Sequence, residues 1–384
     1  MILMSTYYLN EIPFKHVYIH GMLRDEKGNK FSKSAGNNLD PLDVSRKYGT
    51  DALRLSLISG ITPGQDSKFY EEKVESSRNF INKLWNISRY IIDKNQESEI
   101  INQELNKNKL TLADFWILQK MSNLIEEITN EIENYNFSLA IEKIREFVWN
   151  DFADWYVEVS KFEDNKTEKN IILNMLLEDI LKILHPYSPF VTENIWSILS
   201  KENLLISEKY PEKESYRELA SATQADEMRF DLIKEIVIAI RNLRNEHKIE
   251  PAKKITVIFD IKNSPKYGDL LSSQEKLIKH LRTGIDTLEI TLSETEIVNS
   301  IQRNVAGINI HIPLEGLLDK KKEKEKTEKE IANLEKYISN LNGRLHDKEF
   351  TSKAPEGIIA KQKESLAKAE LEISALKNKL ETLT

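Results

Sequence analysis

Apolar residues recur every three or four positions over much of the chain, which is the spacing of one face of an α-helix. The repeat is clear over residues 118–132 and 141–159, while residues 172–184 are apolar on almost every side. A helix that is apolar all round is normally buried. We therefore predict an antiparallel helical bundle over residues 66–215, with the 172–184 helix inside it.

Downstream of the bundle the spacing changes to alternation, which is typical of half-buried strands. Apolar residues alternate around residues 255–259, 288–292 and 308–312. A helical pattern covers residues 226–247, before the first of these strands, and another lies near 272–282. These patterns predict a small α+β module over residues 216–315.

The last part of the chain returns to helical spacing, now in heptad steps of three and four. Two such stretches, residues 331–345 and 359–383, flank the sequence Lys-Ala-Pro-Glu-Gly at 353–357. Heptads place an apolar seam along each helix, and Pro with Gly interrupts the helix between them. We predict that residues 316–384 fold back on themselves as an antiparallel coiled coil.

Residues 1–65 carry shorter signals. Alternation over residues 15–23 predicts a buried strand at 17–19. Asp40 suits a helix N-cap, Pro41 the first helical position and Gly49 the end of that helix. The apolar start of the chain lacks a helix start signal, which predicts either a frayed terminal helix or a chain that begins inside a domain.

Composition narrows the class of protein. A chain of 384 residues predicts two or three domains, because single cores rarely grow past roughly 250–300 residues. Twelve glycines and ten prolines are few for this length, which favours long helices. The absence of cysteine excludes disulfides, a thiol nucleophile and thiolate zinc sites. No run reaches the roughly 18 apolar residues of a membrane helix. The net charge of −7 argues against a globally basic nucleic-acid binder but leaves room for local basic patches.

One segment has a composition that suggests chemistry, namely Lys30-Phe31-Ser32-Lys33-Ser34. It follows the predicted strand and precedes the capped helix, and ligands of α/β sheets bind outside the carboxyl ends of strands. Two ammonium groups and two hydroxyls suit a polyphosphate, because positive charge offsets the charge that develops when a phosphoryl group is attacked. Taken alone, the segment is more simply interpreted as a solvated surface loop.

The flanking residues change that interpretation. Y-I-H-G at 18–21, A-G-N-N-L-D-P at 35–41 and Y-G-T-D-A-L-R-L at 48–55 closely resemble the KMSKS region of class I aminoacyl-tRNA synthetases. Further motifs are similar to the valyl-tRNA synthetase family, and together they cover essentially the whole chain: G-I-T-P-G-Q-D at 60–66, R-N-F-I-N-K-L-W-N-I-S-R at 78–89, F-V-W-N-D-F-A-D-W-Y at 147–156, L-H-P-Y-S-P-F-V-T-E-N-I-W at 184–196 and K-A-P-E at 353–356. Phe31 replaces the Met of the motif's name, and we expect this side chain to pack and not to react.

The resemblance implies a mainly α fold: a partial Rossmann-type catalytic remnant with the KMSKS loop at 1–65, an anticodon-binding bundle, the α+β module and a tRNA-binding coiled-coil arm. It implies a ligase that activates valine with ATP, whose Mg²⁺ is carried by the nucleotide, and transfers valine to tRNA(Val). No protein-bound metal is expected. Lys33 and Lys30 would act on the ATP phosphates, with Ser32 and Ser34 holding the loop or donating to phosphate. His20 and Gly21 would lie near the adenosine, although a histidine that only packs at the strand end is an equal interpretation.

The family also needs an upstream HIGH motif and an editing domain, and no H-x-G-H occurs in this sequence. We therefore expect a C-terminal portion of the enzyme that does not form valyl-adenylate by itself. We also expect a cytoplasmic monomer without membrane contact.

Three groups of residues are candidates for contact with tRNA. They are Asn82, Lys83, Arg89 and Arg145 on the bundle; Arg241, Arg244 and Lys248 along one helix face; and Lys336, Arg344, Lys348 and Lys353 on the arm. For the helix face, a solvated surface is the equal alternative. Aromatic side chains can stack on anticodon bases. However, core packing is favoured for Trp85, Trp149, Trp155 and Trp196 because each lies in or near an apolar stripe.

Two other functions compete with this one. Isoleucyl-tRNA synthetases share the loop and bundle but usually end in a zinc-binding region, and the lack of cysteine argues against them. A non-catalytic adaptor could use the bundle and coiled coil for protein contacts, but it would not need the Lys-Phe-Ser-Lys-Ser loop.

Overall fold

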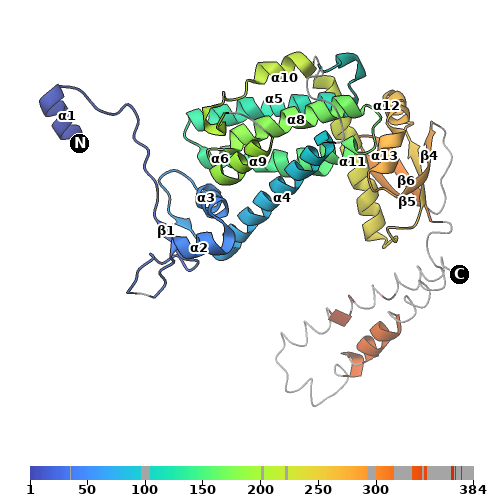
Figure 1. Ribbon diagram of the computed structural model, residues 1–384. Helices are drawn as coiled ribbons and strands as arrows, with labels where there is room; N and C mark the ends of the chain where they lie inside the picture. Colours follow the sequence, from blue (N-terminus) through green and yellow to red (C-terminus); the bar gives the residue numbers. More distant parts are fainter. Residues whose placement is uncertain are drawn as a thin grey trace. The chain divides into compact units, whose positions relative to one another are not determined.

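The computed structural model describes residues 1–34, 36–96, 104–199, 203–220, 224–292, 300–314, 331–339 and 341–343, with positions 365, 366, 368 and 373. Contacts divide the chain into two compact units (Figure 1). The first is Met1–Val237 with Ser273–Leu281, and the second is Ile238–Ser272 with Arg282–Thr384. Each unit is described by itself below.

The predicted helical bundle is present in the first unit, where Figure 1 shows its described helices packed together. The apolar residues that these helices bury form its core. Between Ile172 and Leu184 of α8 most apolar residues are buried, as the pattern predicts, while the polar residues are half-buried on the opposite side. The bundle helices are α4 (Glu71–Gln96), α5 (Leu112–Glu133), α6 (Phe137–Glu146), η2 (Phe147–Tyr156), α7 (Val157–Ser160), α8 (Lys166–Leu184), α9 (Pro189–Ile198), α10 (Lys213–Ala220) and the part of α11 (Gln224–Glu246) that ends at Val237, with short turns η1 (Lys107–Lys109) and η3 (Leu205–Ser207). Among these, η2 is a π-helix. The rest of α11 belongs to the second unit.

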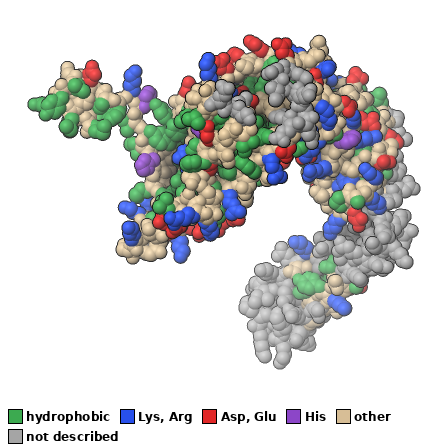
Figure 2. Space-filling view, in the orientation of Figure 1, with side chains coloured by type: hydrophobic (Ala, Val, Ile, Leu, Met, Phe, Trp, Pro, Cys, Tyr) green, Lys and Arg blue, Asp and Glu red, His purple; other side chains and the backbone are tan. Residues whose placement is uncertain are grey.

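The part of the chain before the bundle holds α1 (Ile2–Leu9), β1 (Leu23–Arg24), α2 (Pro41–Tyr48), α3 (Thr50–Ile58) and β2 (Ser67–Lys68). Strands β1 and β2 pair in parallel. Helix α2 begins as predicted, because Asp40 accepts a hydrogen bond from Leu42 N at 2.8 Å and Pro41 takes the first helical position. Helix α1 buries none of its residues, and Figure 2 shows its hydrophobic side chains exposed.

The predicted buried strand at 17–19 is wrong. Val17 and Ile19 are each 69% exposed, and no described strand lies beside them. A strand needs a partner that takes up its backbone hydrogen bonds, and β2 offers one only from residue 22 onward. There Ser67 N donates to Met22 O at 3.0 Å and Phe69 N donates to Arg24 O at 2.8 Å.

The second unit contains a four-stranded sheet with strand order β4-β3-β6-β5. Alternation correctly predicts three of the strands, and it misses β5, whose burial alternates only weakly. Its elements are β3 (Ile255–Asp260), η4 (Pro265–Tyr267), α12 (Gly268–Ser273), β4 (Ile285–Thr291), β5 (Ser300–Val305) and β6 (Ile308–Pro313), while α13 (Glu275–His280) belongs to the first unit. Residues 331–339 and 341–343 are helical. The rest of the predicted coiled coil lies largely outside the described residues.

Candidate functional site: a lysine loop and a groove on the helical bundle

The Lys-Phe-Ser-Lys-Ser loop is anchored by its aromatic residue. Phe31 is partly buried against a cluster that contains Val44 and Phe69, as expected for a side chain that packs. Lys30 and Lys33 are exposed, and neither has an ion-pair partner in the part of the chain that the structure describes. The loop therefore presents two ammonium groups to solvent on either side of a fixed ring.

Behind the loop, one amide side chain connects several backbone positions. Asn37 Oδ1 accepts a hydrogen bond from Ser32 N at 2.9 Å, and its Nδ2 donates to Lys30 O at 3.1 Å and to Asp25 Oδ2 at 2.9 Å. Asp25 also accepts from Asn29 N at 2.7 Å. The hydrogen bond from Asn37 is the largest of the effects that hold the pKa of Asp25 below its ordinary value, which keeps this carboxylate an acceptor.

The two serines of the loop bond to each other, with Ser32 Oγ and Ser34 Oγ 2.7 Å apart. Ser34 is exposed and Ser32 is half-buried. Because each hydroxyl has further hydrogen-bonding capacity, the pair can hold the loop's shape and still donate to an anion. The structure thus brings Lys30, Ser32, Lys33 and Ser34 onto one short loop.

His20 and Gly21 lie beside the segment that enters β2. His20 is exposed, and its Nδ1 lies 2.8 Å from Gly21 O. A Cβ added at Gly21 would lie 1.7 Å from Gln65 O, so only glycine permits this close approach of the two backbones. Asp66 then accepts from Met22 N at 2.8 Å. Gly21 therefore has a backbone role that the sequence did not reveal.

A second feature lies along α4, where the bundle surface is hollowed. One hollow, of about 450 Å³, is lined by Asn79, Asn82, Lys83 and Asn86 of α4 together with residues of η2 and α7. A neighbouring hollow of about 390 Å³ shares Asn79 and is lined by Arg145 and Trp149. We call these two hollows together the α4 groove. Asn79 and Asn86 are missed by the sequence analysis, although their spacing from Asn82 places all three on one helical face.

Charge and aromatic surface meet in the α4 groove. Lys83 Nζ lies 4.0 Å from the centroid of the Trp149 ring and donates to Asp154 Oδ1 at 2.7 Å. Arg145 is half-buried, with its guanidinium carbon 5.4 Å from the Phe80 ring centroid. Burial lowers the pKa of Arg145 from its very high ordinary value, and the guanidinium stays charged because arginine is not deprotonated in proteins. The groove can accept a flat ring beside two cations.

The four tryptophans considered in the sequence analysis differ in how much of each side chain is exposed. Trp155 and Trp196 are 7% and 2% exposed, which confirms core packing for both, and Trp85 is half-buried. Trp149 differs, because 38% of it is exposed. Its place on the π-helix η2 brings its ring over Lys83, so the favoured interpretation as a core residue is wrong for Trp149. Arg89 is exposed on α4 but does not line the groove.

Two of the expected phosphate contacts on α11 need correction. Arg244 is 5% exposed, and its guanidinium donates to the carbonyl oxygens of Thr283 at 2.8 Å and Glu250 at 2.7 Å. It therefore satisfies backbone acceptors inside the second unit and cannot reach a phosphate. Lys248 is exposed but lies beyond the end of α11 with φ 52°, so it does not continue a helix face with the half-buried Arg241.

The candidates on the C-terminal arm are only partly described. Lys336 is exposed on the helical segment 331–339. Arg344, Lys348 and Lys353 lie outside the described residues.

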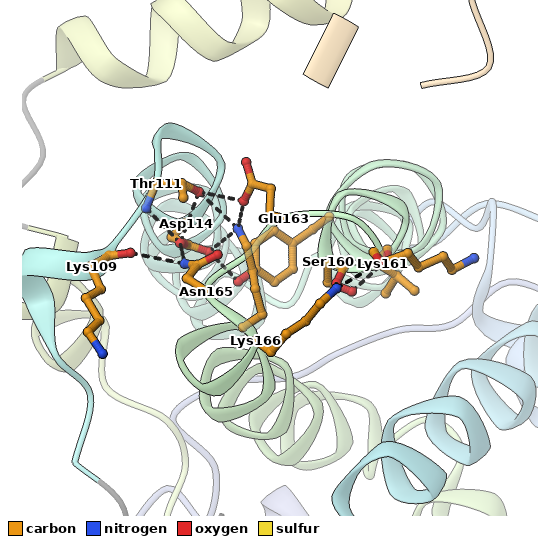
Figure 3. Close-up of polar contacts among 11 residues, drawn as sticks. Lys109, Thr111, Asp114, Ser160, Lys161, Glu163, Asn165 and Lys166 are labelled. Atoms are coloured by element: carbon orange, nitrogen blue, oxygen red, sulfur yellow. Dashed lines mark hydrogen bonds and ion pairs between the residues drawn. The ribbon is translucent and has the colours of Figure 1, made fainter. Parts of the chain in front are cut away.

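A buried polar cluster connects three helices of the bundle, and Figure 3 shows its residues Asp114, Glu163 and Asn165 close together. Lys169 of α8 is fully buried, donates to Asp114 Oδ1 of α5 at 2.6 Å and forms a second ion pair with Glu163. The Tyr156 hydroxyl donates to Asp114 Oδ1 at 2.7 Å, and Asn165 Nδ2 donates to Asp114 Oδ2 at 3.0 Å. Burial raises the pKa of Tyr156, so its hydroxyl remains a donor. Since buried charges are costly unless paired, this cluster fixes how α5, η2 and α8 meet.

Among the described residues, no group of three or more His, Asp or Glu side chains lies together in a way that could hold a metal ion. None of the helices in the described part of the chain is long and apolar enough to cross a membrane.

Comparisons with known proteins match three successive parts of the chain. Residues 1–70 match the class I tRNA synthetases for isoleucine, leucine, methionine and valine, and residues 114–259 match the anticodon-binding domain of tRNA ligases. Residues 319–384 match the tRNA-binding arm of valyl-tRNA synthetase. The lysine loop and the α4 groove lie within or beside the first two of these regions.

Individual relatives match over the full length of the chain. Valine–tRNA ligase of Syntrophotalea carbinolica is 35% identical, covering 100% of this chain and 43% of that protein. The enzyme of Clostridium tetani is 36% identical with the same two coverages. Among solved structures, a leucyl-tRNA synthetase complex from Agrobacterium radiobacter K84 has a TM-score of 0.47 and 21% identity, over 58% of this chain and 27% of that one.

The family matches over residues 1–70 and 114–259 place the chain among the class I aminoacyl-tRNA synthetases. Within that class, the chain belongs to the valine–tRNA ligase family and corresponds to a C-terminal portion of its members. It spans 43% of the length of the curated relatives named above. Neither the isoleucyl alternative nor the adaptor is favoured by these matches.

Proposed function

We propose that this chain supplies two parts of a valine–tRNA ligase, namely the loop that contacts the phosphates of ATP and the surfaces that bind tRNA(Val). The observation that carries the proposal is the exposed lysine pair Lys30 and Lys33 on an anchored loop, in a chain 35% identical over its whole length to valine–tRNA ligases. Residues 1–65 would belong to a Rossmann-type nucleotide-binding domain, 66–215 to the anticodon-binding domain, 216–315 to the α+β module and 316–384 to a coiled-coil arm.

The reaction assigns a role to each loop residue. When the valine carboxylate attacks the α-phosphate of ATP, the bond to the β-phosphate breaks and pyrophosphate leaves with added negative charge. Lys33 and Lys30 would stabilise that charge, because ammonium groups placed where charge develops lower the barrier. Ser32 and Ser34 would donate to phosphate oxygens. Magnesium would arrive with the nucleotide, whose phosphates are its usual ligands.

The α4 groove would receive unpaired bases of the tRNA. Single-stranded RNA is recognised by stacking its bases on aromatic side chains and by hydrogen bonds to their edges. Trp149 offers a ring face, Lys83 and Arg145 offer positive charge, and Asn79 and Asn82 offer amides that can donate to and accept from a base edge. Arg89 and Lys336 would contact phosphates outside the groove.

The experiment is a binding titration of this chain with valine tRNA and isoleucine tRNA at two salt concentrations, about 50 and 200 mM. We expect preferential binding of valine tRNA that weakens steeply with salt, because phosphate contacts release counterions. Equal binding of both RNAs would contradict the assignment to valine. Affinity that does not change with salt would contradict the basic contacts.

A second measurement tests the catalytic part. We expect no valine-dependent exchange of pyrophosphate into ATP by this chain alone, because its sequence lacks the HIGH motif. Exchange above background would show that the loop does not need that motif.

A further inference from the structure

We propose that Asn37 is a positioning residue that sets the direction of both loop lysines for polyphosphate binding. The inference rests on the proposed function, because it concerns the same loop. It adds a residue that lies outside the Lys-Phe-Ser-Lys-Ser segment and carries no charge. Its basis is the set of three hydrogen bonds that the Asn37 amide makes to Lys30 O and Ser32 N, on either side of Phe31, and to the carboxylate of Asp25.

The orientation of this amide follows from its partners. Nδ2 faces two acceptors, the Asp25 carboxylate and Lys30 O, while Oδ1 faces the donor Ser32 N–H. The reverse orientation would place an oxygen against two oxygens and a nitrogen against an N–H. All three hydrogen bonds therefore depend on an asparagine at this position.

The three hydrogen bonds fix the loop backbone around its anchored ring. Lys30 O precedes Phe31 and Ser32 N follows it, so Asn37 holds the residues on each side of the ring. Lys33 comes directly after Ser32. Since the ring is packed and both neighbouring peptide groups are bonded, the two lysine stems leave the backbone in defined directions.

Asp25 connects this brace to the rest of the fold. The Asp25 carboxylate accepts from Asn37 and from Asn29 N, and Asp25 N donates to Asn29 O at 2.8 Å across a tight turn. The neighbouring Arg24 lies in β1, which pairs with β2. The loop is thereby tied through Asn37 and Asp25 to the strand pair. A loop held this way has lost part of its conformational freedom before a ligand arrives, and that favours binding.

The sequence provides a matched control. Asn38 is the same residue type one position later, is exposed and makes no hydrogen bond with its side chain among the described residues. Replacing Asn37 or Asn38 with Ala removes the same atoms. Only Asn37→Ala removes the hydrogen bonds to Lys30 O and Ser32 N.

The test measures binding of inorganic tripolyphosphate by calorimetry, together with trypsin cleavage after Lys30 and Lys33. We expect Asn37→Ala to weaken tripolyphosphate binding about tenfold and to speed cleavage several-fold without ligand, while Asn38→Ala matches the wild type. Saturating tripolyphosphate should return the cleavage rate of Asn37→Ala to that of the liganded wild type. The backbone amide signal of Ser32 should also shift in Asn37→Ala and not in Asn38→Ala.

The outcomes separate this inference from the proposed function. If the wild type binds tripolyphosphate and Asn37→Ala binds it equally well, the positioning role is wrong and the phosphate-binding loop stands. If the wild type does not bind, or Lys33→Met binds as well as the wild type, the phosphate role of the loop fails and this inference with it. If Asn37→Ala lowers the melting temperature, tripolyphosphate binding by Asp25→Ala becomes the deciding measurement, because that variant removes the carboxylate to which Asn37 is bonded. Unchanged tripolyphosphate binding by Asp25→Ala would overturn the proposal.

Discussion

The carboxylate of Asp51 in α3 accepts a hydrogen bond of 2.6 Å from the backbone N–H of Val191, in the first turn of α9. Its other oxygen accepts from Phe190 N at 3.3 Å. Asp51 is 6% exposed. Although it lies far from α9 in the sequence, its carboxylate accepts hydrogen bonds from the N–H groups that have no partner within that helix, and its negative charge offsets the positive N-terminal end of α9. Ser188 occupies the N-cap, yet its hydroxyl is buried without a hydrogen-bond partner in the described structure.

We expect Asp51→Ala to lower the free energy of unfolding by about 1–2 kcal/mol, the usual cost of losing an N-terminal cap. Urea denaturation followed by circular dichroism measures it. Ser188→Ala is the matched control, and we expect a change below about 0.5 kcal/mol because that hydroxyl makes no hydrogen bond. A larger loss of unfolding free energy in Ser188→Ala than in Asp51→Ala would show that the serine, and not the aspartate, caps α9.

Asp51 also makes the stability of the folded chain depend on pH. Burial raises the pKa of Asp51 above its ordinary value of 3.8, so the folded chain holds this proton more tightly than the unfolded chain. The stability that this shift contributes is complete below the unfolded pKa and is lost as the pH rises through the folded pKa. We expect the stability of the wild type relative to Asp51→Asn to be greatest below the unfolded pKa of 3.8 and to fall as the pH rises through the folded pKa. If the stability of the wild type relative to Asp51→Asn instead grows with pH, the pKa of Asp51 is lowered in the folded chain.

A prediction about the bundle core concerns Lys169. We expect Lys169→Met to cost about 3–5 kcal/mol, because it leaves Asp114 and Glu163 without their buried cation. Lys161→Met is the control, since its partner Glu158 lies one helical turn away on the partly exposed surface and such pairs contribute less than about 1 kcal/mol. Guanidinium denaturation of both variants gives the comparison. Equal costs would mean that the buried cluster contributes no more than a surface pair.

The α4 groove gives a prediction for RNA binding. We expect Trp149→Ala to weaken binding of valine tRNA by about 5- to 150-fold, because stacking of one base on an aromatic ring contributes about 1–3 kcal/mol. Phe190→Ala removes another exposed aromatic ring, 62% exposed on α9 and outside the groove, and should bind as the wild type does. Fluorescence anisotropy with labelled tRNA distinguishes them. Similar losses in both variants would argue against a specific stacking site.

Gly21 leads to a prediction about the strand pair behind the lysine loop. We expect Gly21→Ala to cost about 1–3 kcal/mol, because the added Cβ would collide with the backbone of Gln65. Hydrogen exchange should quicken at Ser67 and Phe69, whose N–H groups donate to Met22 O and Arg24 O. Gly343→Ala, which meets no atom within 4 Å, should leave exchange at these positions unchanged. Unchanged exchange in Gly21→Ala would mean that the backbone can move aside.

Sequence periodicity predicts those parts of the structure that depend on neighbouring residues. The helix at 172–184, the start of α2 at Asp40 and three strands of the second unit are examples. The strand at 17–19 fails because a strand depends on a partner that a local pattern does not contain. The capping of α9 has the same cause, because Ser188 takes the N-cap position while the capping carboxylate of Asp51 comes from another helix.

The site shows the same division between local and long-range information. The exposure of Lys30 and Lys33 can be predicted from their own charged segment, whereas their proposed role and the packing of Phe31 rest on the resemblance carried by the flanking motifs. The role of Asn37 depends on loop closure that brings residue 25 beside residue 37. The burial of Arg244 and the exposure of Trp149 depend on which side of a helix meets its neighbours, and one-dimensional spacing could not assign either.

The π-helical winding of η2 has a consequence for insertions and deletions in this family. Ten residues, Phe147–Tyr156, are wound more widely than an α-helix, and Trp149 and Asp154 both lie on them. Removing one residue would let the segment relax to α-helical winding, which turns about 100° per residue, and would rotate the residues on one side of the deletion relative to those on the other. Lys83 would then lose the ring or the carboxylate that it contacts, although every side chain involved would still be present. If the α4 groove binds a base as proposed, relatives that differ by one residue in the length of this segment should therefore read a different base or none, even where the residues that line the groove are identical.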